Sequence, residues 1–256
     1  MNFRKLKFLN KKIENILKNS SLVSEMSTNI SKGDVYIVKK VFKENWIERL
    51  KIYLINVGQN SIPNYQNIRH GTPNFHRINR NDKRAYVQGC FHQFAFFPWN
   101  QDYFNLFKES KHIYFLKNLL SGIKKTKFIG HTPDDNCIAR ISIQFYPAGE
   151  GFLNRHSDPV DYHQLVVPML IMSKIGKDFH DGGAFFVNQK GISENIEKLV
   201  SEGDVIFFNA GLLHGVKTID KDCKLRWTDF KGRWSMLFAV NKLEENSLIG
   251  NSIDLG

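Results

Sequence analysis

The spacing of apolar and polar residues changes near residue 138, and this change divides the chain. Before it, apolar residues recur mostly at helical spacing; after it, short apolar or alternating segments are separated by Gly, Asp and Asn. The pattern predicts a basic, helix- and loop-rich part over 1–137, a β core over 138–243 and a weakly structured tail over 244–256. We therefore expect a mainly β fold with an N-terminal α-rich extension packed on the core.

The N-terminal segment places apolar residues at helical spacing, with lysines and arginines between them: Phe3, Leu6, Leu9, Ile13, Ile16 and Leu17. This spacing predicts an amphipathic basic helix, which docks either on its own domain or weakly on a membrane surface. Further helices are expected around 43–56 and near 101–120. Between them, 57–84 is predicted to be loop and 86–100 to be extended.

The second part contains six segments with the patterns of strands. The segment "ARISIQFY" alternates, "FLNRHSD" stops at Pro159, and "QLVVPMLIMS" is an apolar run in which Pro168 indicates a bulge. Turn residues precede the other three, which are "DGGAFFV", "GDVIFFNA" and "GRWSMLFAV". Short strands separated by such turns favour a β-sandwich or barrel.

Composition places the chain among globular proteins. Its 256 residues suffice for one large domain, and 42% apolar and 24% charged residues are ordinary values. No apolar run approaches the roughly 18 residues that span a membrane, and the first residues lack the apolar stretch of a secretory signal. Three widely spaced cysteines suggest reduced thiols in a cytoplasmic protein: Cys90, Cys137 and Cys223.

The net charge of +11 is carried entirely by the first 100 residues. This excess either keeps the protein soluble or attracts an anionic partner, such as an acidic metabolite, a membrane surface or a nucleic acid. A nucleic acid is disfavoured because the chain shows no recognition motif and no regular basic-aromatic stripe. The sequence does not define an oligomeric state.

The segment "RHSDPVDYH" contains two histidine–aspartate pairs, His156 with Asp158 and Asp161 with His163. Residues two apart share a face of an extended chain, so either pair can place an imidazole and a carboxylate on one metal ion. Pro159 interrupts the strand between the two pairs. On this ground the first pair is favoured as a metal site, and the second is assigned to the rim.

A third metal ligand is expected from His214, which lies just past the buried strand "GDVIFFNA". Two imidazoles and one carboxylate make the facial triad of non-haem Fe(II) oxygenases. Three ligands on one face of an octahedral ion leave three positions for a cosubstrate and O₂. A lone His-x-Asp is a weak signal, so the prediction depends on the whole set.

The segment "GRWSMLF" adds a candidate carboxylate-binding site. Arg233 and Ser235 are co-facial, and an arginine inside a barrel is costly without a partner. A guanidinium with a nearby hydroxyl suits a carboxylic acid. Arg226 is the alternative because it lies closer to His214, but it sits in a charged loop, whereas Arg233 begins an apolar strand.

Together, and in this order, these segments resemble the Fe(II)/2-oxoglutarate-dependent dioxygenases over about residues 138–241. The resemblance implies a double-stranded β-helix, the jelly-roll fold of cupin-like barrels, that uses Fe(II), 2-oxoglutarate and O₂. Its motifs match three iron ligands, a clamp on the distal carboxylate of 2-oxoglutarate and a further hydrogen bond to it: His156, Asp158 and His214; Arg233 with Ser235; and Tyr146. The interval from His214 to Arg233 is longer than the family commonly shows.

By this resemblance the chain is expected to hydroxylate a small molecule, such as an amino acid, a sugar-like metabolite or a natural-product intermediate, with release of succinate and CO₂. Asp158 favours hydroxylation, since halogenating relatives have a small residue there. The alternatives are an oxygenase of a macromolecule or anionic glycolipid, and a non-catalytic cupin-like binding barrel. Candidate substrate contacts lie in loops outside the barrel and at its rim: Arg69, Asn74, His76, Arg77, Asp161 and His163.

Overall fold

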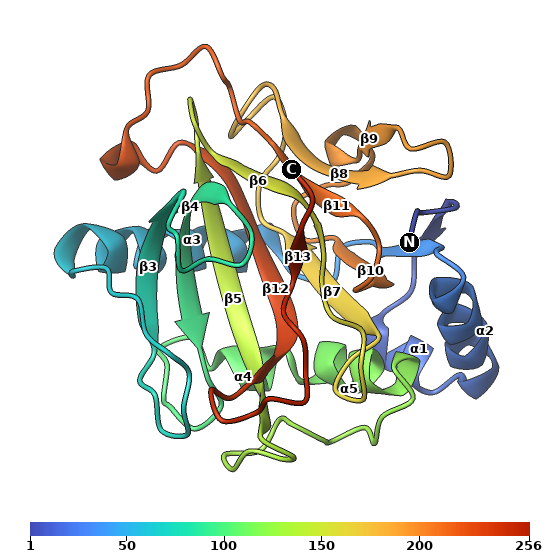
Figure 1. Cartoon of the computed structure of the whole chain (residues 1–256). Coiled ribbons are helices and arrows are strands. Elements are labelled where there is room, and N and C mark those ends of the chain that lie inside the picture. The colour runs from blue at the N-terminus through green and yellow to red at the C-terminus, as the bar shows by residue number, and fades with distance from the viewer.

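The computed structural model describes residues 1–256 and has a curled, mixed β-sheet of thirteen strands as its core (Figure 1). The strands are β1 (Leu6–Leu9), β2 (Val35–Val38), β3 (Phe75–Arg80), β4 (Gly89–Phe96), β5 (Cys137–Pro147), β6 (Phe152–Ser157), β7 (Val166–Ile171), β8 (Gly183–Val187), β9 (Ser193–Asn195), β10 (Val205–Asn209), β11 (His214–Lys217), β12 (Gly232–Lys242) and β13 (Ile253–Asp254). The helices are α1 (Ile13–Leu17), α2 (Ser20–Ser31), α3 (Glu44–Asn60), α4 (Leu106–Glu109) and α5 (Lys111–Leu120), with 3-10 turns η1 (Glu197–Leu199) and η2 (Trp227–Asp229).

The sheet curls into two walls. The larger wall has the order β1-β2-β10-β7-β12-β5-β4, with β3 on the edge of β4. The smaller wall has the order β6-β11-β8-β9, with β13 on the edge of β6. The walls join where β4 pairs with β6 over a short register at Gly89 and Cys90. This architecture confirms the expected mainly β, jelly-roll core.

Helices cover the outer face of the larger wall, while its inner face lines the space between the walls (Figure 1). Side chains alternate between the two faces along each strand. On β10, Phe207 packs against apolar side chains of the helices, on the outer face of the wall. Ile206 and Phe208 pack on the inner face, with side chains of β7 and β8. A strand buried on both faces needs a continuous apolar run, which explains the pattern of "VIFF".

The N-terminal helix prediction is wrong in part. Residues 6–9 form β1, parallel to β2 with Leu6 opposite Val35, and only 13–17 are helical. Pairing with an available strand outweighs the weak helix propensity of so short a segment. The apolar side chains of Ile13 and Ile16 are buried in the core of the protein, so they are not presented to a membrane. No helix has the length and hydrophobicity needed to cross a membrane.

Three other expectations need correction. The first 137 residues supply strands β1 to β4 as well as helices, and β3 lies within the stretch predicted to be loop. The tail is not weakly structured throughout, because β13 pairs with β6. Pro168 marks no bulge: the register with β10 continues through it, and pairing with β12 begins at Met169, where a backbone N–H is available.

Candidate metal centre

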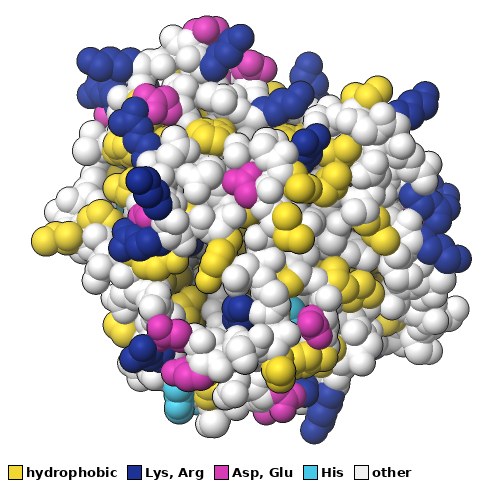
Figure 2. All heavy atoms as spheres, in the orientation of Figure 1, with side chains coloured by type: hydrophobic (Ala, Val, Ile, Leu, Met, Phe, Trp, Pro, Cys, Tyr) yellow, Lys and Arg dark blue, Asp and Glu magenta, His cyan; other side chains and the backbone are white.

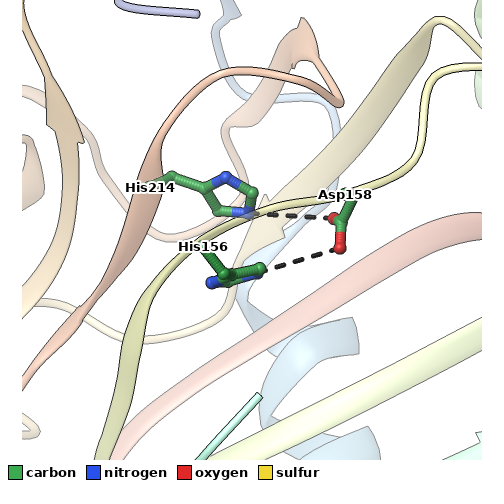
Figure 3. Close-up of side chains that lie close together, drawn as sticks. All are labelled: His156, Asp158 and His214. Carbon is green, nitrogen blue, oxygen red and sulfur yellow. Dashed lines mark ion pairs between the residues drawn. The ribbon is translucent and has the colours of Figure 1, made fainter. Parts of the chain in front are cut away.

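Two neighbouring strands of the smaller wall bring His156, Asp158 and His214 together (Figure 3). His156 on β6 and His214 on β11 are directly opposite in the antiparallel register, and their ring centroids are 4.2 Å apart. Asp158 follows the end of β6, and its two carboxylate oxygens lie 3.8 Å from Nε2 of His156 and of His214. One potential ligand atom from each side chain falls within 4.8 Å of the others, so the three can bind one metal ion.

The backbone fixes which ring nitrogen of each histidine faces the site. Nδ1 of His156 lies 2.8 Å from the carbonyl oxygen of Asn154, and Nδ1 of His214 lies 2.8 Å from that of Leu212. Because a carbonyl only accepts, both Nδ1 atoms carry the proton, and both Nε2 lone pairs are free toward Asp158. This is the usual tautomer of metal-binding histidines whose second nitrogen is held by a carbonyl.

Asp158 is positioned by segments far apart in the sequence. Its backbone N–H donates to the carbonyl of Ala210 at 2.9 Å, and its Oδ1 accepts a hydrogen bond from Oγ of Ser252 at 2.6 Å. Burial raises the pKa of the Asp158 carboxyl, but the charges of His156 and His214 and the Ser252 bond outweigh it, so this pKa lies below its usual value. The carboxylate is therefore ionised at neutral pH, as a metal ligand must be.

The surroundings of His214 are apolar. Its ring lies 5.0 Å from that of Phe208 and 6.1 Å from that of Phe186. Burial, followed by the charge of His156, lowers the pKa of His214 to about 4. The next residue, Gly215, permits close approach of β11 to β6, because a Cβ there would lie 2.8 Å from the carbonyl oxygen of Leu153.

Arg233 and Ser235 point from β12 into the same cavity as the metal group. Arg233 is 1% exposed, and its Nη1 donates to Oγ of Ser235 at 3.1 Å. Its Nε donates to Oε1 of Glu197 at 2.5 Å, and its Nη2 is buried without a protein partner. An unpaired guanidinium nitrogen beside a hydroxyl fits a carboxylate oxygen.

Tyr146 lies opposite Arg233 in the β12–β5 register, with Cζ of Arg233 5.7 Å from its ring centroid. Its hydroxyl donates to Oε1 of Gln144 at 2.8 Å, and burial raises its pKa. Arg226 is 65% exposed outside the cavity and forms an ion pair with Asp229. The geometry thus favours Arg233 over Arg226 for the predicted clamp.

The metal group and Arg233 line one cavity with a volume of about 500 Å³. Of the candidate substrate residues, Arg77 and His163 line it. The others do not: Arg69 forms an ion pair with Glu244 at the rim, Asn74 bonds to the Phe97 amide, His76 faces His92 on the opposite side of β3, and Asp161 is exposed and accepts from the Tyr162 amide. We therefore leave these four out of the proposed substrate site.

Three residues of the site were missed from the sequence, namely Glu197, Arg140 and Ser252. Glu197 approaches Arg233 because Gly183 leaves room for it: a Cβ on Gly183, whose φ is +102°, would lie 2.3 Å from Cγ of Glu197. Arg140 shares the inner face of β5 with Ser142, Gln144 and Tyr146, each two residues from the next, and the alternation of "ARISIQFY" is the one signal that could have indicated it.

Fold and site together define a double-stranded β-helix with a buried His-Asp-His metal-binding group. No protein-family model matches the chain, and no curated protein matches its sequence. Its fold is that of Fe(II)/2-oxoglutarate oxygenases. A Pseudomonas putida prolyl-4-hydroxylase superposes with a TM-score of 0.53 at 11% identity, over 86% of this chain and 98% of that chain.

Two further structures show the same likeness. The thymine-7-hydroxylase of Neurospora crassa, in complex with alpha-KG (2-oxoglutarate) and thymine, has a TM-score of 0.53 at 11% identity, over 95% of this chain and 87% of that chain. A Trichoplax adhaerens prolyl hydroxylase, in complex with a hypoxia inducible factor peptide, has a TM-score of 0.52 at 11% identity, over 91% and 94%. At this identity the likeness concerns the fold, and the site's chemistry depends on the residues described above.

Proposed function

We propose that this protein is an Fe(II)- and 2-oxoglutarate-dependent oxygenase that hydroxylates a small molecule. The observation that carries the proposal is the His156–Asp158–His214 group at a cavity that also contains Arg233 with an unpaired Nη2. Two neutral imidazoles and a carboxylate form the donor set suited to Fe(II). The iron would be bound by these three residues, and it supplies the means of activating O₂.

The overall reaction balances as 2-oxoglutarate, O₂ and a substrate C–H giving succinate, CO₂ and a substrate C–OH. Arg233 and Ser235 would bind the distal carboxylate of 2-oxoglutarate, because Nη1 of Arg233 donates to the Ser235 hydroxyl and Nη2 of the same guanidinium has no protein partner. Tyr146 would add a hydroxyl beside them. The apolar side chains of Phe186 and Phe208 exclude water around His214.

The size of the cavity supports a small-molecule substrate. Its volume of about 500 Å³ lies within the usual range for small ligands and their cofactors, roughly 300–1,000 Å³. Residues Ile249, Gly250, Asn251 and Ser252 of the C-terminal segment form part of its lining.

The experiment is a metabolite screen that measures succinate formation and O₂ uptake with Fe(II) and 2-oxoglutarate. We expect a slow substrate-independent rate, stimulated by the correct substrate and lost in Asp158→Ala and His214→Ala. Absence of succinate and O₂ uptake from the iron-loaded protein with every compound would favour a non-catalytic binding barrel instead. Stimulation by peptides alone would favour the macromolecular alternative.

A further inference from the structure

Two arginines in the cavity, Arg77 on β3 and Arg140 on β5, have no acidic partner. Neither takes part in any ion pair with the protein. The third arginine of the cavity, Arg233, differs because Glu197 neutralises it. The carboxylate of Asp158 is committed to the metal group.

Arg140 is the more unusual of the two, because its guanidinium donates no hydrogen bond to the protein and its Nε is buried. Burial, followed by the charge of Arg77, lowers the pKa of Arg140 to about 10, so it remains charged at neutral pH. Arg140 is partly buried, and a cation whose buried Nε has no partner is unfavourable in the empty protein. Such a group is explained when a ligand supplies the missing negative charge.

Arg77 is held in place by neighbours that leave part of its guanidinium free. Its Nε donates to Oε1 of Gln93 at 2.7 Å, and Nε2 of Gln93 donates to Oγ of Ser142 at 2.5 Å. The ring of Tyr65 lies 4.7 Å from Cζ of Arg77. The hydrogen bonds end at Ser142, which makes no bond to Arg140 but lies two residues from it on β5, so both arginines face the cavity from the inner face of one wall.

Both arginines are separate from the proposed 2-oxoglutarate clamp: Arg77 lies on β3, three strands away from β12, and Arg140 lies further along the sheet. Arg233 lies opposite Tyr146, whereas Arg140 lies opposite Ala239, six residues further along β12, or about 20 Å along the strand. Arg140, Arg233 and the metal group all line one cavity. A ligand bound at Arg140 therefore shares that cavity with the metal group while it leaves Arg233 free for 2-oxoglutarate.

Other side chains that are positively charged or lack a hydrogen-bond partner line the cavity together with Arg140. The buried His163, whose Nδ1 has no partner, and Lys242 line the same cavity, and the only other acid of the lining, Glu244, is neutralised by Arg69 at the rim. In Figure 2, basic side chains lie mainly at the periphery of the visible face, with one basic group recessed toward its centre.

We propose that the substrate is a small anion whose carboxylate or phosphate group is bound by Arg140 and Arg77. The part concerning a substrate rests on the proposed function, but the anion site itself does not. A guanidinium pair binds either group through bidentate, charge-assisted hydrogen bonds. It would fix the anionic end and leave an adjacent C–H to face the metal group.

Anion binding tests the site without turnover. Calorimetric titrations of inorganic phosphate and of malonate would use the anaerobic protein with Mn(II) and saturating 2-oxoglutarate, which keeps the clamp filled. We expect one site in the wild type, weakened at least tenfold in Arg140→Met and in Arg77→Met, and retained in part in Arg140→Lys. Arg226→Met is the matched control, because Arg226 is exposed outside the cavity. Tighter binding of phosphate would point to a phosphate monoester, and tighter binding of malonate to a carboxylic acid.

The outcomes separate the anion site from the proposed reaction. Anion binding that is absent in the wild type, or unchanged in both Arg140→Met and Arg77→Met, overturns the inference. Loss of substrate-independent succinate formation in Arg140→Met, with retention in Arg233→Met, would make Arg140 the 2-oxoglutarate clamp and also overturn it. Arginine-dependent anion binding without any turnover of 2-oxoglutarate would support the anion site while contradicting the proposed function. If Arg140→Met fails to fold, Arg77→Met and Arg140→Lys carry the same test.

Discussion

Oε1 of Glu197 lies 2.5 Å from Nε of Arg233, and both side chains are only 1% exposed. The same Oε1 accepts the backbone N–H of Ala184 at 2.7 Å, so β8 holds the carboxylate in place. The proposed clamp is thus electrically neutral before 2-oxoglutarate arrives. A carboxylate of 2-oxoglutarate would therefore bind a guanidinium, that of Arg233, whose positive charge is already balanced by Glu197.

We expect Glu197→Gln to destabilise the ligand-free protein by about 3–5 kcal/mol, because it leaves a buried guanidinium unpaired. The variant should gain a larger increase in Tm from 2-oxoglutarate than the wild type, since the cosubstrate then supplies the only negative charge. Thermal unfolding with and without 2-oxoglutarate measures both effects, with the exposed Glu109→Gln as control. An equal 2-oxoglutarate shift in Glu197→Gln and wild type would show that Glu197 does not tune the clamp.

Arg233→Met should weaken 2-oxoglutarate binding by about 100-fold or more, as expected for loss of a buried charge partner. It also leaves Glu197 unpaired, so the double variant Arg233→Met/Glu197→Gln should be more stable than Arg233→Met alone. Calorimetry with Mn(II) gives the affinity, and urea unfolding gives the stability. Arg226→Met serves as control, and a greater loss of affinity in that variant would transfer the clamp to Arg226.

His214→Ala should abolish high-affinity metal binding, with a loss of at least about 100-fold, because it removes one of three ligands. His163→Ala is a matched control, since His163 lines the same cavity outside the triad. Titration of Mn(II) followed by electron paramagnetic resonance measures the affinity directly. Equal losses in the two variants would mean that the triad is not the metal site.

Stability should fall as the pH drops below about 6.5. Burial and the charge of His76 lower the pKa of His92 to about 3, and burial, followed by the charge of Lys117, lowers that of His163 to about 4. The unfolded chain, with histidine pKa values near 6.5, then binds more protons than the folded protein, so acid favours unfolding. Each group contributes about 1.4 kcal/mol per pH unit between its unfolded and folded pKa values.

His92→Gln should therefore flatten the pH dependence of the unfolding free energy by about 1.4 kcal/mol per unit between about pH 6 and pH 5. Urea unfolding at several pH values, in the presence of a chelator, measures this slope. The absolute stability of the variant does not matter for the test, because the slope alone reports the protons taken up. A slope equal to that of the wild type would contradict the assignment of His92 as a buried neutral group.

Ser252→Ala should lower metal affinity by about tenfold, because hydrogen bonds to a ligating carboxylate hold it in position. The hydroxyl of Ser252 donates to Oδ1 of Asp158 in the structure. Mn(II) titration measures the change, with Ser247→Ala as control. An unchanged affinity would show that the backbone bond from Asp158 to Ala210 suffices to orient the carboxylate.

The six strand segments expected after residue 138 and the metal group could be predicted from the sequence because their signals are local. Alternation identifies β5, and the i, i+2 spacing of His156 and Asp158 puts both on one side of the chain. The partnership of Glu197 with Arg233 could not be predicted, since it depends on how the turn after β9 folds back on β8. The helix expected over the first residues failed for a related reason: a strand pairing with residues 35–38 decides the state of 6–9.

β13 lies against β6, with Asp254 opposite His156. Ser252, the residue immediately before β13, donates a hydrogen bond to Asp158. Two consecutive backbone pairs therefore couple the metal group to a short edge strand whose Ile253 side chain is 60% exposed. An edge of this kind can act as a built-in reporter: a solvatochromic dye on a cysteine placed at Ile253 would sense loading of a buried site without touching it. Filling and emptying of the metal centre could then be followed in real time by fluorescence at the surface.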